Sequence, residues 1–335
     1  MNMLHERPAC PISVVIPVHQ KGEHILGAIR SVLNQSMTPL EIIVVDDAST
    51  DGGIAKLAAL DIPNLRLLRR DQPGPGGYAA RNLAIKNARG EWIAFLDADD
   101  EWLPNHLETI HHAATSAPAS VGCVFCGFDF LEPSGLARRD SYSSLHADRG
   151  PTQLSFSQFL DGWVNAGDCP AWTGATAVRR STLLAAGLFP EHRCRRGGDK
   201  DLWLRCVAKG GAIAVSTITA RYNRNATNMV TRRETKRVYP CVCQSAIELI
   251  SGSSRRDAWR LKQLCNREIF AYAFASWREG PIGMELSQGF SASADPAHYF
   301  LLLGMSLVSG PSIEPLRTAI RKLRHGWRET SPRSV

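Results

Sequence analysis

An apolar run that leads directly into clustered carboxylates constrains this chain more than any other feature. The apolar segment 93–96 is followed by Asp97, Asp99 and Asp100, so three acidic residues stand within four positions. A short apolar run bounded by polar residues predicts a buried strand, and open α/β sheets bind ligands at the carboxyl ends of their strands. Because clustered carboxylates repel one another, the segment favours Mg²⁺ or Mn²⁺, which take oxygen ligands and can bridge to a diphosphate. A solvated acidic turn is the alternative.

Strand and helix patterns alternate around this segment. Apolar, β-branched runs predict strands at 12–16, 41–45, 65–68 and 91–96, and apolar residues at helical spacing predict helices at 25–33 and 79–88. This alternation indicates an α/β fold with a Rossmann-like, mostly parallel central sheet flanked by helices. Further strands are expected near 121–126, 172–180 and 212–215, with a polar surface loop at 138–155 and a helical C-terminal extension beyond residue 231.

The charge of the chain is unevenly distributed. The net charge is +7, and residues 231–335 hold 16 Lys and Arg against 9 Asp and Glu, so the whole excess lies in this last third. Such a surplus favours peripheral contact with anionic lipid headgroups, with a solvated helical face as the alternative. No apolar run approaches the roughly 18 to 20 residues that span a bilayer, and the run at 299–308 is expected to be a core helix rather than an interfacial one. We expect no nucleic-acid partner, and the oligomeric state stays open.

The cysteines bear on the compartment. Nine are scattered along the chain, and an odd, scattered set predicts reduced thiols in the cytoplasm. The pairs Cys123/Cys126 and Cys241/Cys243 differ in spacing and lie in apolar runs, which argues against a zinc site. The N-terminus lacks an apolar signal core, so export is not expected. We therefore expect a cytoplasmic protein, with peripheral membrane contact on that face.

Polar residues also end two other predicted strands. Asp46 and Asp47 close the strand at 41–45, where a carboxylate can accept hydrogen bonds from a base or a ribose hydroxyl. His19, just after the first strand, offers a flat ring for stacking. Arg81, at the start of a helix, could orient the acidic cluster or touch phosphate. Strand ends in parallel share one edge of the sheet, so these groups are expected to converge.

A separate carboxylate lies about a hundred residues after the acidic cluster. Asp199 follows two glycines and precedes an amphipathic helix. A carboxylate in the first helical turn is favoured by the helix dipole, so simple capping is one interpretation. The other is a general base that removes a proton from an attacking hydroxyl. Asp201 is the rival carboxylate for that role.

Several ordered motifs of this chain resemble inverting glycosyltransferases of family 2. The resemblance runs from about residue 10 to 228 and is carried by the segments 14–19, 31–35, 44–52, 80–82, 95–100 and 198–205. It implies a GT-A fold in which residues 10–230 form the transferase domain, with a nucleotide-binding half at 10–100 and an acceptor half at 101–230. Residues 231–335 form a basic, mainly helical extension outside the resemblance.

The resemblance implies a role for individual residues. A nucleotide-sugar site would comprise Pro17, His19, Asp46, Asp47, Arg81, Asp97 and Asp99. Within that set, Asp99 would ligate Mn²⁺ or Mg²⁺, and Asp97 would lie near the ribose and the metal. Asp199 matches the base that deprotonates the acceptor hydroxyl. The pocket under the donor sugar and the acceptor would include Trp172, Thr173 and Gly174.

Three residues depart from the pattern of the family. His19 stands where Tyr is frequent, Gly198 replaces the usual Glu before the base, and Asn225 stands where a His often helps the metal or the diphosphate. The departures at 198 and 225 keep open a non-catalytic protein that binds sugar nucleotides or acts as a scaffold.

The resulting expectation is an enzyme that inverts the anomeric centre while moving a sugar from a nucleotide-diphospho-sugar, most simply a UDP-sugar. The acceptor would be a hydroxyl of a glycan or of a lipid-linked acceptor, in cell-surface polysaccharide synthesis. A nucleotidyltransferase is the other enzymatic alternative. It would carry a Gly-rich basic loop after the first strand, and the segment 17–22 holds one Lys and one Gly.

Overall fold

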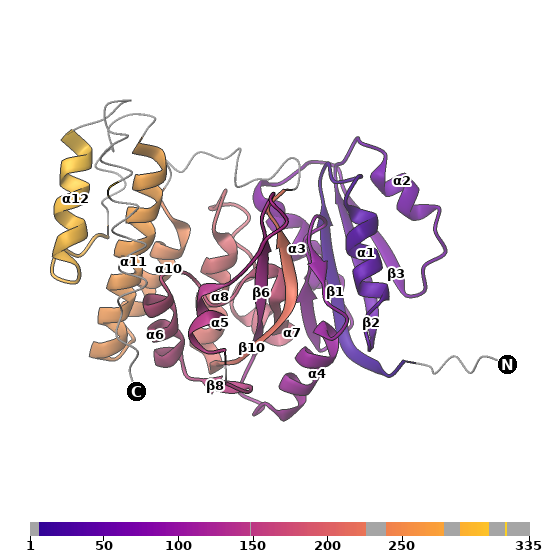
Figure 1. Cartoon of the computed structure of the whole chain (residues 1–335), viewed down its shortest axis with the longest axis horizontal. Helices are drawn as coiled ribbons and strands as arrows, with labels where there is room; N and C mark the ends of the chain where they lie inside the picture. Colours follow the sequence, from indigo (N-terminus) through magenta and orange to yellow (C-terminus); the bar gives the residue numbers. More distant parts are fainter. Residues whose placement is uncertain (1–6, 148, 226–238, 278–288, 308–318, 320–335) are drawn as a thin grey trace.

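The computed structural model describes residues 7–147, 149–225, 239–277, 289–307 and 319. It contains one large mixed sheet with helices packed on both faces (Figure 1). The strands are β1 Ala9–Val18, β2 Thr38–Asp47, β3 Leu65–Arg70, β4 Trp92–Phe95, β5 Glu101–Trp102, β6 Cys123–Leu131, β7 Ala137–Arg139, β8 Thr152–Leu154, β9 Thr176–Arg179 and β10 Ala212–Asn223. The helices are α1 Ile25–Leu33, α2 Gly53–Ala58, α3 Tyr78–Asn87, α4 His106–Ser116, α5 Ser141–Leu145, α6 Phe156–Ala166, α7 Arg180–Ala185, α8 Gly198–Gly210, α10 Cys241–Ile250, α11 Arg255–Ser276 and α12 Pro296–Leu307, with short 3₁₀ turns at Pro75–Gly77 and Thr173–Ala175.

The N-terminal strands form a parallel half-sheet in the order β3-β2-β1-β4. The register sets Val18 of β1 beside Asp46 of β2, and Val15 of β1 beside Phe95 of β4. Parallel neighbours end at the same edge of a sheet, so the polar segments after β1, β2 and β4 emerge together.

The other half of the sheet is mixed. β9 pairs antiparallel with both β4 and β6, and β6 pairs parallel with β10. The short strands β5 and β8 add antiparallel edges to β10, and β7 adds one to β6. The predicted α/β class, with a central sheet flanked by helices, is confirmed, and its parallel part is the half that the sequence pattern described.

Alternation along the strands divides the core between the two faces of the sheet. In β1, Val14 and Ile16 face the layer of α1, α2 and α4, whereas Val15 faces the layer that contains α3, α6 and α8. Successive side chains of a strand point to opposite faces, so a strand that is covered on both sides must be apolar throughout. This requirement accounts for the unbroken Val and Ile runs of β1 and β2.

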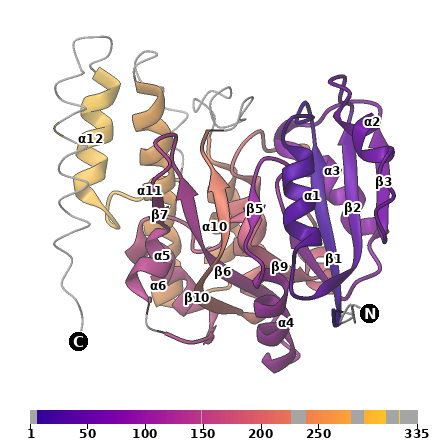
Figure 2. The same cartoon turned by 45° about the vertical axis from the view of Figure 1, so that its right-hand side comes forward.

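The C-terminal helices pack against the second of these layers. α10 contacts α8, and α11 contacts α6, with α12 outermost (Figures 1 and 2). The interior residues of α10 and α11 belong to the same apolar cluster as α8. The expectation of a core helix at 299–308 is wrong for most of α12, because only Leu302 and Met305 are buried there. Its exposed large apolar residues are Tyr299, Phe300, Leu301, Leu303 and Leu307.

Two other predictions are corrected. Residues 138–155 do not form a simple surface loop, since they contain α5 and β8 and bury Asp140, Tyr142 and Ser143. The thiols are not all reduced: Cys194 and Cys241 form a disulfide, and the other seven cysteines are free. The cross-link joins residues 47 apart in sequence, which by loop-closure entropy alone would stabilise the fold by about 4 kcal/mol. The cysteine count therefore no longer supports a cytoplasmic location.

Within the described part of the chain, every helix is too short or too polar to span a bilayer.

A buried histidine makes the stability of this fold depend on pH. His106, at the start of α4, stacks on Trp102 with ring centroids 4.2 Å apart, and its Nδ1 lies 2.8 Å from the hydroxyl of Thr219. Burial lowers the pKa of His106 from 6.5 to about 3. Below pH 6.5 the unfolded chain thus binds a proton that the folded chain does not, so the free energy of unfolding falls as the pH is lowered.

We expect His106→Gln to remove this dependence. Between pH 6.5 and about 5, the wild type should lose about 1.5 kcal/mol more stability than the variant. Urea denaturation at the two pH values measures the difference. His112→Gln, an exposed histidine on the same helix, serves as the control and should behave like the wild type. Parallel pH profiles for wild type and His106→Gln would contradict the assignment.

Candidate active site

The predicted residues surround one cavity of about 1360 Å³ at the edge of the sheet where β1, β2 and β4 end. Its walls come from the segments after these strands, the 73–78 loop, the end of β6, the 163–173 segment and the start of α8. The middle of α11 and His298 of α12 complete it. Of the predicted site residues, those that line the cavity are Pro17, His19, Asp47, Arg81, Asp97, Asp99, Trp172, Thr173 and Asp199.

The acidic segment after β4 separates into two kinds of carboxylate. Asp97 and Asp99 line the cavity, while Asp100 is buried beside it and accepts a hydrogen bond from the main-chain N–H of Asn223 at 2.8 Å. Burial, together with the charges of Asp99 and Asp97, raises the pKa of Asp100 well above its usual range. The chain turns after β4, where the N–H of Asp100 donates to the carbonyl of Asp97 at 3.1 Å, and this turn separates Asp100 from the two cavity carboxylates. Asp100 is thus a buried residue behind the cavity lining.

Each of the two cavity carboxylates already has a cationic partner. The ammonium of Lys21 lies 2.6 Å from Oδ2 of Asp99, with both side chains only about an eighth exposed. Arg81, at the first turn of α3, forms an ion pair with Asp97 and also donates to the carbonyl of Gly76 at 2.7 Å. The predicted orienting contact of Arg81 is present. Lys21 was not predicted as a site residue, although it is the single basic residue in the loop that follows β1.

The polar residues at the ends of β1 and β2 differ in their access to the cavity. His19 is exposed there, and its Nδ1 donates to the main-chain carbonyl of Asp47 at 2.7 Å. Asp47 pairs with Arg70 and accepts from the N–H of Gly74 at 3.1 Å, so it ties β2 to the 73–78 loop. Asp46 lies outside the cavity lining and accepts from the N–H of Ser49 at 2.8 Å. His19 and Asp47, two of the residues predicted to bind the nucleotide, therefore line the cavity, whereas Asp46 does not.

Asp199 enters the cavity from the first turn of α8. The helix begins after Gly197, which has φ of +72° and so adopts a conformation that side chains disfavour. The carboxylate of Asp199 caps no main-chain N–H and accepts a hydrogen bond from the hydroxyl of Thr173 at 3.2 Å. Its rival Asp201 has no exposed side-chain surface and is bound by Arg193, Arg205 and Ser245. Asp199 is the carboxylate of this helix that can meet a substrate.

Packing explains the glycine that precedes Asp199. A Cβ at Gly198 would lie 2.8 Å from the ring of Tyr78 and 3.0 Å from Pro190. The N–H of Gly198 donates to the hydroxyl oxygen of Tyr78 at 2.9 Å. Burial, and secondarily the charge of Asp199, raises the pKa of Tyr78, which therefore stays a neutral phenol. Gly198 is thus a requirement of the contact with α3 rather than a sign of a decayed site.

An aromatic wall lies beside the base candidate. Trp172 packs on Phe128 and Tyr222, with ring centroids 4.7 and 5.2 Å apart. Gly174 is buried and does not line the cavity, but a Cβ there would lie 2.3 Å from the ring of Trp172. The predicted segment 172–174 therefore supplies one aromatic face, one hydroxyl and one small residue that makes room for the ring.

The C-terminal extension contributes residues that sequence patterns did not predict. Lys200 bonds Asp168 at 2.7 Å and Glu268 of α11 at 2.9 Å. Burial alone would lower the pKa of Lys200, but the two carboxylates raise it well above its usual range. Arg267 and Tyr272 of α11 also line the cavity. No local signal in the basic helical region indicated that one of its helices closes the site.

The carboxylates after β4 fit a divalent cation held by few protein ligands. Mg²⁺ is commonly bound by one or two carboxylates while substrate phosphates and water fill its other positions, and Asp97 and Asp99 supply this chemistry. Among the described residues, no group of three or more His, Cys, Asp and Glu is arranged around one point. Asn225 is exposed, and its N–H donates to the side chain of Asn223 at 3.0 Å. Residues 226–228, which follow Asn225, lie outside the described residues.

The fold and the cavity define an α/β protein in which an acidic strand end and a separate carboxylate line one cavity. The chain matches the model of the family described as glycosyl transferase family 2 over residues 13–180, half of its length. It therefore belongs to family 2 of the glycosyltransferases, and the resemblance read from the motifs is confirmed.

Relatives support this membership over different lengths. The uncharacterized glycosyltransferase YibD of Escherichia coli is 42% identical over 191 residues, covering 53% of this chain and 52% of the relative. The succinoglycan biosynthesis protein ExoO of Rhizobium meliloti is 40% identical, covering 46% and 42%. The glycosyltransferase AglE of Haloferax volcanii is 33% identical and covers 78% of both chains. The chain thus spans about half the length of the first two relatives.

Solved structures share the fold. TarS 1-349 of S. aureus, in complex with UDP-GlcNAc, has a TM-score of 0.66 at 14% identity, covering 94% of this chain and 92% of that one. The mannosyltransferase PcManGT of Pyrobaculum calidifontis, in complex with GDP-Man and Mn²⁺, has a TM-score of 0.53 at 19% identity, covering 92% and 82%. At these identities the likeness concerns the fold alone.

The ion pair between Lys21 and Asp99 leads to a prediction about metal binding. Asp99→Ala should weaken Mn²⁺-dependent binding of UDP by about 100-fold or more, because even the partners of metal ligands matter at the 10- to 100-fold level. Lys21→Met should tighten binding of Mn²⁺ alone by about fivefold, since it removes one repulsive charge. Isothermal calorimetry measures both. Glu101→Ala, an exposed carboxylate two residues beyond Asp99, is the control; unchanged binding in Asp99→Ala would refute the assignment of Asp99 as metal ligand.

Proposed function

We propose that this protein transfers a sugar from a nucleotide-diphospho-sugar to an acceptor hydroxyl with inversion at the anomeric carbon. The observation that carries the proposal is the placement of Asp199 in the same cavity as Asp97 and Asp99. An inverting transfer needs one group that holds the leaving diphosphate and one base on the acceptor side. Family membership supports transfer of a glycosyl group rather than a nucleotidyl group.

In this proposal the residues of the chain divide the work. His19 and Asp47 hold the nucleoside, and Arg81 keeps Asp97 oriented toward it. Thr173 steers the carboxylate of Asp199 by its hydrogen bond. Asp199 removes the proton from the acceptor hydroxyl, whose oxygen forms a bond to the anomeric carbon. The bond from that carbon to the diphosphate breaks, and the nucleoside diphosphate leaves with the electron pair.

A divalent cation would be held by Asp99 with support from Asp97, and it would supply positive charge to the leaving diphosphate. Lys21 contributes a second positive charge at the same place. The chemistry of Asp199 and Thr173 on the acceptor side is independent of which cation is bound.

The choice of substrates is proposed from relatives and neighbours. A UDP-sugar donor is supported by the UDP-GlcNAc complex of TarS, whereas PcManGT binds GDP-Man. A glycan or lipid-linked acceptor, in cell-surface polysaccharide synthesis, is supported by the match to a succinoglycan biosynthesis protein. The aromatic wall around Trp172 suits a sugar ring, because aromatic faces pack well against apolar C–H surfaces.

Replacement of the base tests the proposal most directly. Asp199→Asn should keep donor affinity and lower kcat by about 10² to 10⁴, the usual contribution of a general base. Donor binding is measured by calorimetry and transfer by release of nucleoside diphosphate with a panel of donors and acceptors. Asp168→Asn changes another carboxylate of the cavity wall and should retain most of the transfer activity. Donor binding by the wild type without turnover of any donor would instead support the non-catalytic alternative.

We further propose peripheral contact with an anionic membrane through α12 and the basic C-terminal third. The exposed apolar side chains of α12 and the charge surplus of 231–335 support it. The cytoplasmic face stays a prediction.

Vesicle flotation tests the membrane contact. The full chain should float with phosphatidylglycerol vesicles at low salt and not with phosphatidylcholine vesicles. Phe300→Ser should weaken binding by about tenfold, because burial of a large apolar side chain contributes at least about 1.5 kcal/mol. Leu136→Ser, at an equally exposed apolar residue of the β6–β7 turn, is the control. Equal flotation of both variants would count against α12 as the contact surface.

A further inference from the structure

The segment between α7 and α8 leads directly to Asp199 in the first turn of α8, and it is anchored first to α3. The side chain of Asn82 accepts from the N–H of Phe189 and donates to its carbonyl, both at 2.9 Å. Nine residues further on, Tyr78 accepts from the N–H of Gly198. In both anchors the residue of α3 lies within the family match at 13–180, and its partner lies beyond it.

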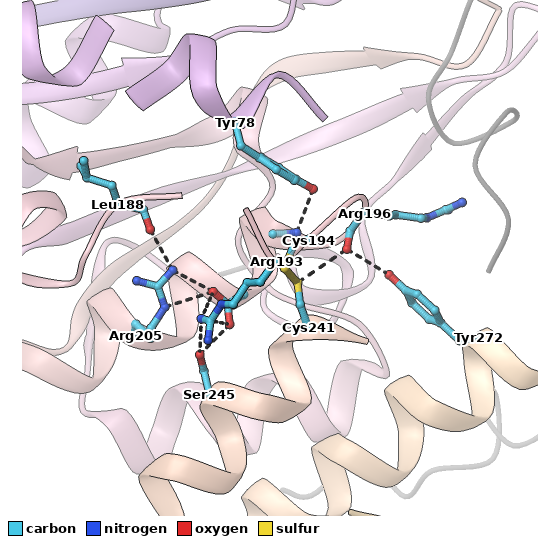
Figure 3. The surroundings of a disulfide bond; sticks show 11 residues. Tyr78, Leu188, Arg193, Cys194, Arg196, Arg205, Cys241, Ser245 and Tyr272 are labelled. Carbon is cyan, nitrogen blue, oxygen red and sulfur yellow. Dashed lines mark hydrogen bonds and ion pairs between the residues drawn. A yellow bond between two sulfur atoms is a disulfide. The ribbon is translucent and has the colours of Figure 1, made fainter. Parts of the chain in front are cut away.

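The disulfide attaches the same segment to the C-terminal extension. Cys194 and Cys241 are both buried, with Cα atoms 5.9 Å apart, and Cys241 is the first residue of α10 (Figure 3). Cys194 lies five residues before Asp199, and both cysteines lie beyond the family match at 13–180. The bond connects the segment that precedes Asp199 to the first helix of the C-terminal extension.

A buried carboxylate forms the second connection. Asp201, in the first turn of α8, has no exposed side-chain surface. It is bound by Arg193 at 3.0 Å, by Arg205 at 2.7 Å and by the hydroxyl of Ser245 at 2.6 Å. Ser245 belongs to α10, and Arg193 precedes Cys194 (Figure 3). A buried charge is costly without such partners. Because Asp201 belongs to α8 and Ser245 to α10, their hydrogen bond helps to keep the two helices in contact.

The backbone between the disulfide and Asp199 is the part that needs an external restraint. Gly197 and Gly198 precede Asp199, and glycine adds conformational freedom to the chain. The carbonyl oxygen of Arg196 lies 3.6 Å from Sγ of Cys241, a contact without a proton because the sulfur is in a disulfide. The hydroxyl of Tyr272 in α11 donates to the same oxygen at 3.5 Å (Figure 3). Contacts with α10 and α11 thus restrain this stretch, in addition to the bond from Gly198 to Tyr78 of α3.

We propose that the Cys194–Cys241 disulfide is a positioning element of the transfer reaction. It holds the 193–198 segment on α10, and through that segment it sets the direction of the Asp199 carboxylate toward the acceptor. The inference rests on the proposed function of Asp199. Reduction by a dithiol transfers two electrons to the S–S bond, yields the two cysteine thiols and closes the reagent to its own disulfide. The chain then loses the covalent link while Arg193 and Ser245 keep their hydrogen bonds to Asp201.

The kinetic test compares oxidised and dithiothreitol-treated wild type. Reduction should lower kcat by about tenfold, because small displacements of a catalytic group have effects of this size or larger, and it should leave the KM for the donor within about twofold, because the donor site lies at the ends of β1, β2 and β4. The double variant Cys194→Ser/Cys241→Ser keeps the other seven cysteines and should match the reduced wild type with or without dithiothreitol. A response of the double variant to the reagent would overturn the proposal.

Hydrogen exchange supplies a readout that does not require activity. Peptides covering 193–205 should exchange faster after reduction, whereas peptides from β1 should not change. Mass mapping of the unreduced protein must show the Cys194–Cys241 pair, and its absence would refute the proposal. Unchanged kcat together with unchanged exchange at 193–205, in protein shown to be reduced, would refute it as well. If oxidised protein transfers no sugar from any donor, the proposed function fails and the positioning role in transfer fails with it, whereas a transferring protein whose kcat is unchanged by reduction refutes the positioning role alone.

Discussion

Parallel pairing of β1 with β2 and β4 is the constraint on which the rest of the structure depends. The register places Val18 beside Asp46 and Val15 beside Phe95, so three polar segments leave the sheet at one edge. Hydrogen-bonded strands cannot slip without turning apolar side chains toward the wrong face. The unbroken apolar runs, covered on both faces by helices, therefore hold the cavity in place more firmly than any contact between the polar residues themselves.

The polar residues at this edge are held by opposite charges from other parts of the chain. Lys21 meets Asp99, Arg81 meets Asp97, and Arg70 meets Asp47. Asp100 has no cationic partner among the described ion pairs, and burial, followed by the charges of Asp99 and Asp97, raises its pKa. In the proposed function Lys21 and Arg81 face the diphosphate of the donor, so the cations that pair with these carboxylates also suit a negatively charged ligand.

Much of the N-terminal half could be predicted from the sequence, because local patterns decide it. Strands β1, β2, β3 and β4 were anticipated within a few residues, and Asp199 was singled out by its glycines and its helix. The misses have a common physical cause. Gly198 is required by its contact with Tyr78, which lies 120 positions away in the sequence. The 138–155 segment is ordered by burial against distant residues. The composition of α12 is apolar, but most of its large apolar side chains are exposed. Contacts between distant segments leave no periodic signal along the chain.

By itself the sequence determined the class of the fold, the family and the carboxylates at its strand ends, because hydrophobic periodicity and ordered motifs are local properties of the chain. Only the tertiary structure decided which carboxylates share a cavity, that Asp201 is a buried ion-pair partner while Asp199 is open to a substrate, and that α11 forms a wall of the site. The pairing of Cys194 with Cys241 belongs to the second group. Two cysteines 47 residues apart can bond only when packing brings their Cα atoms close, and nothing in the spacing of nine cysteines reveals which two will meet.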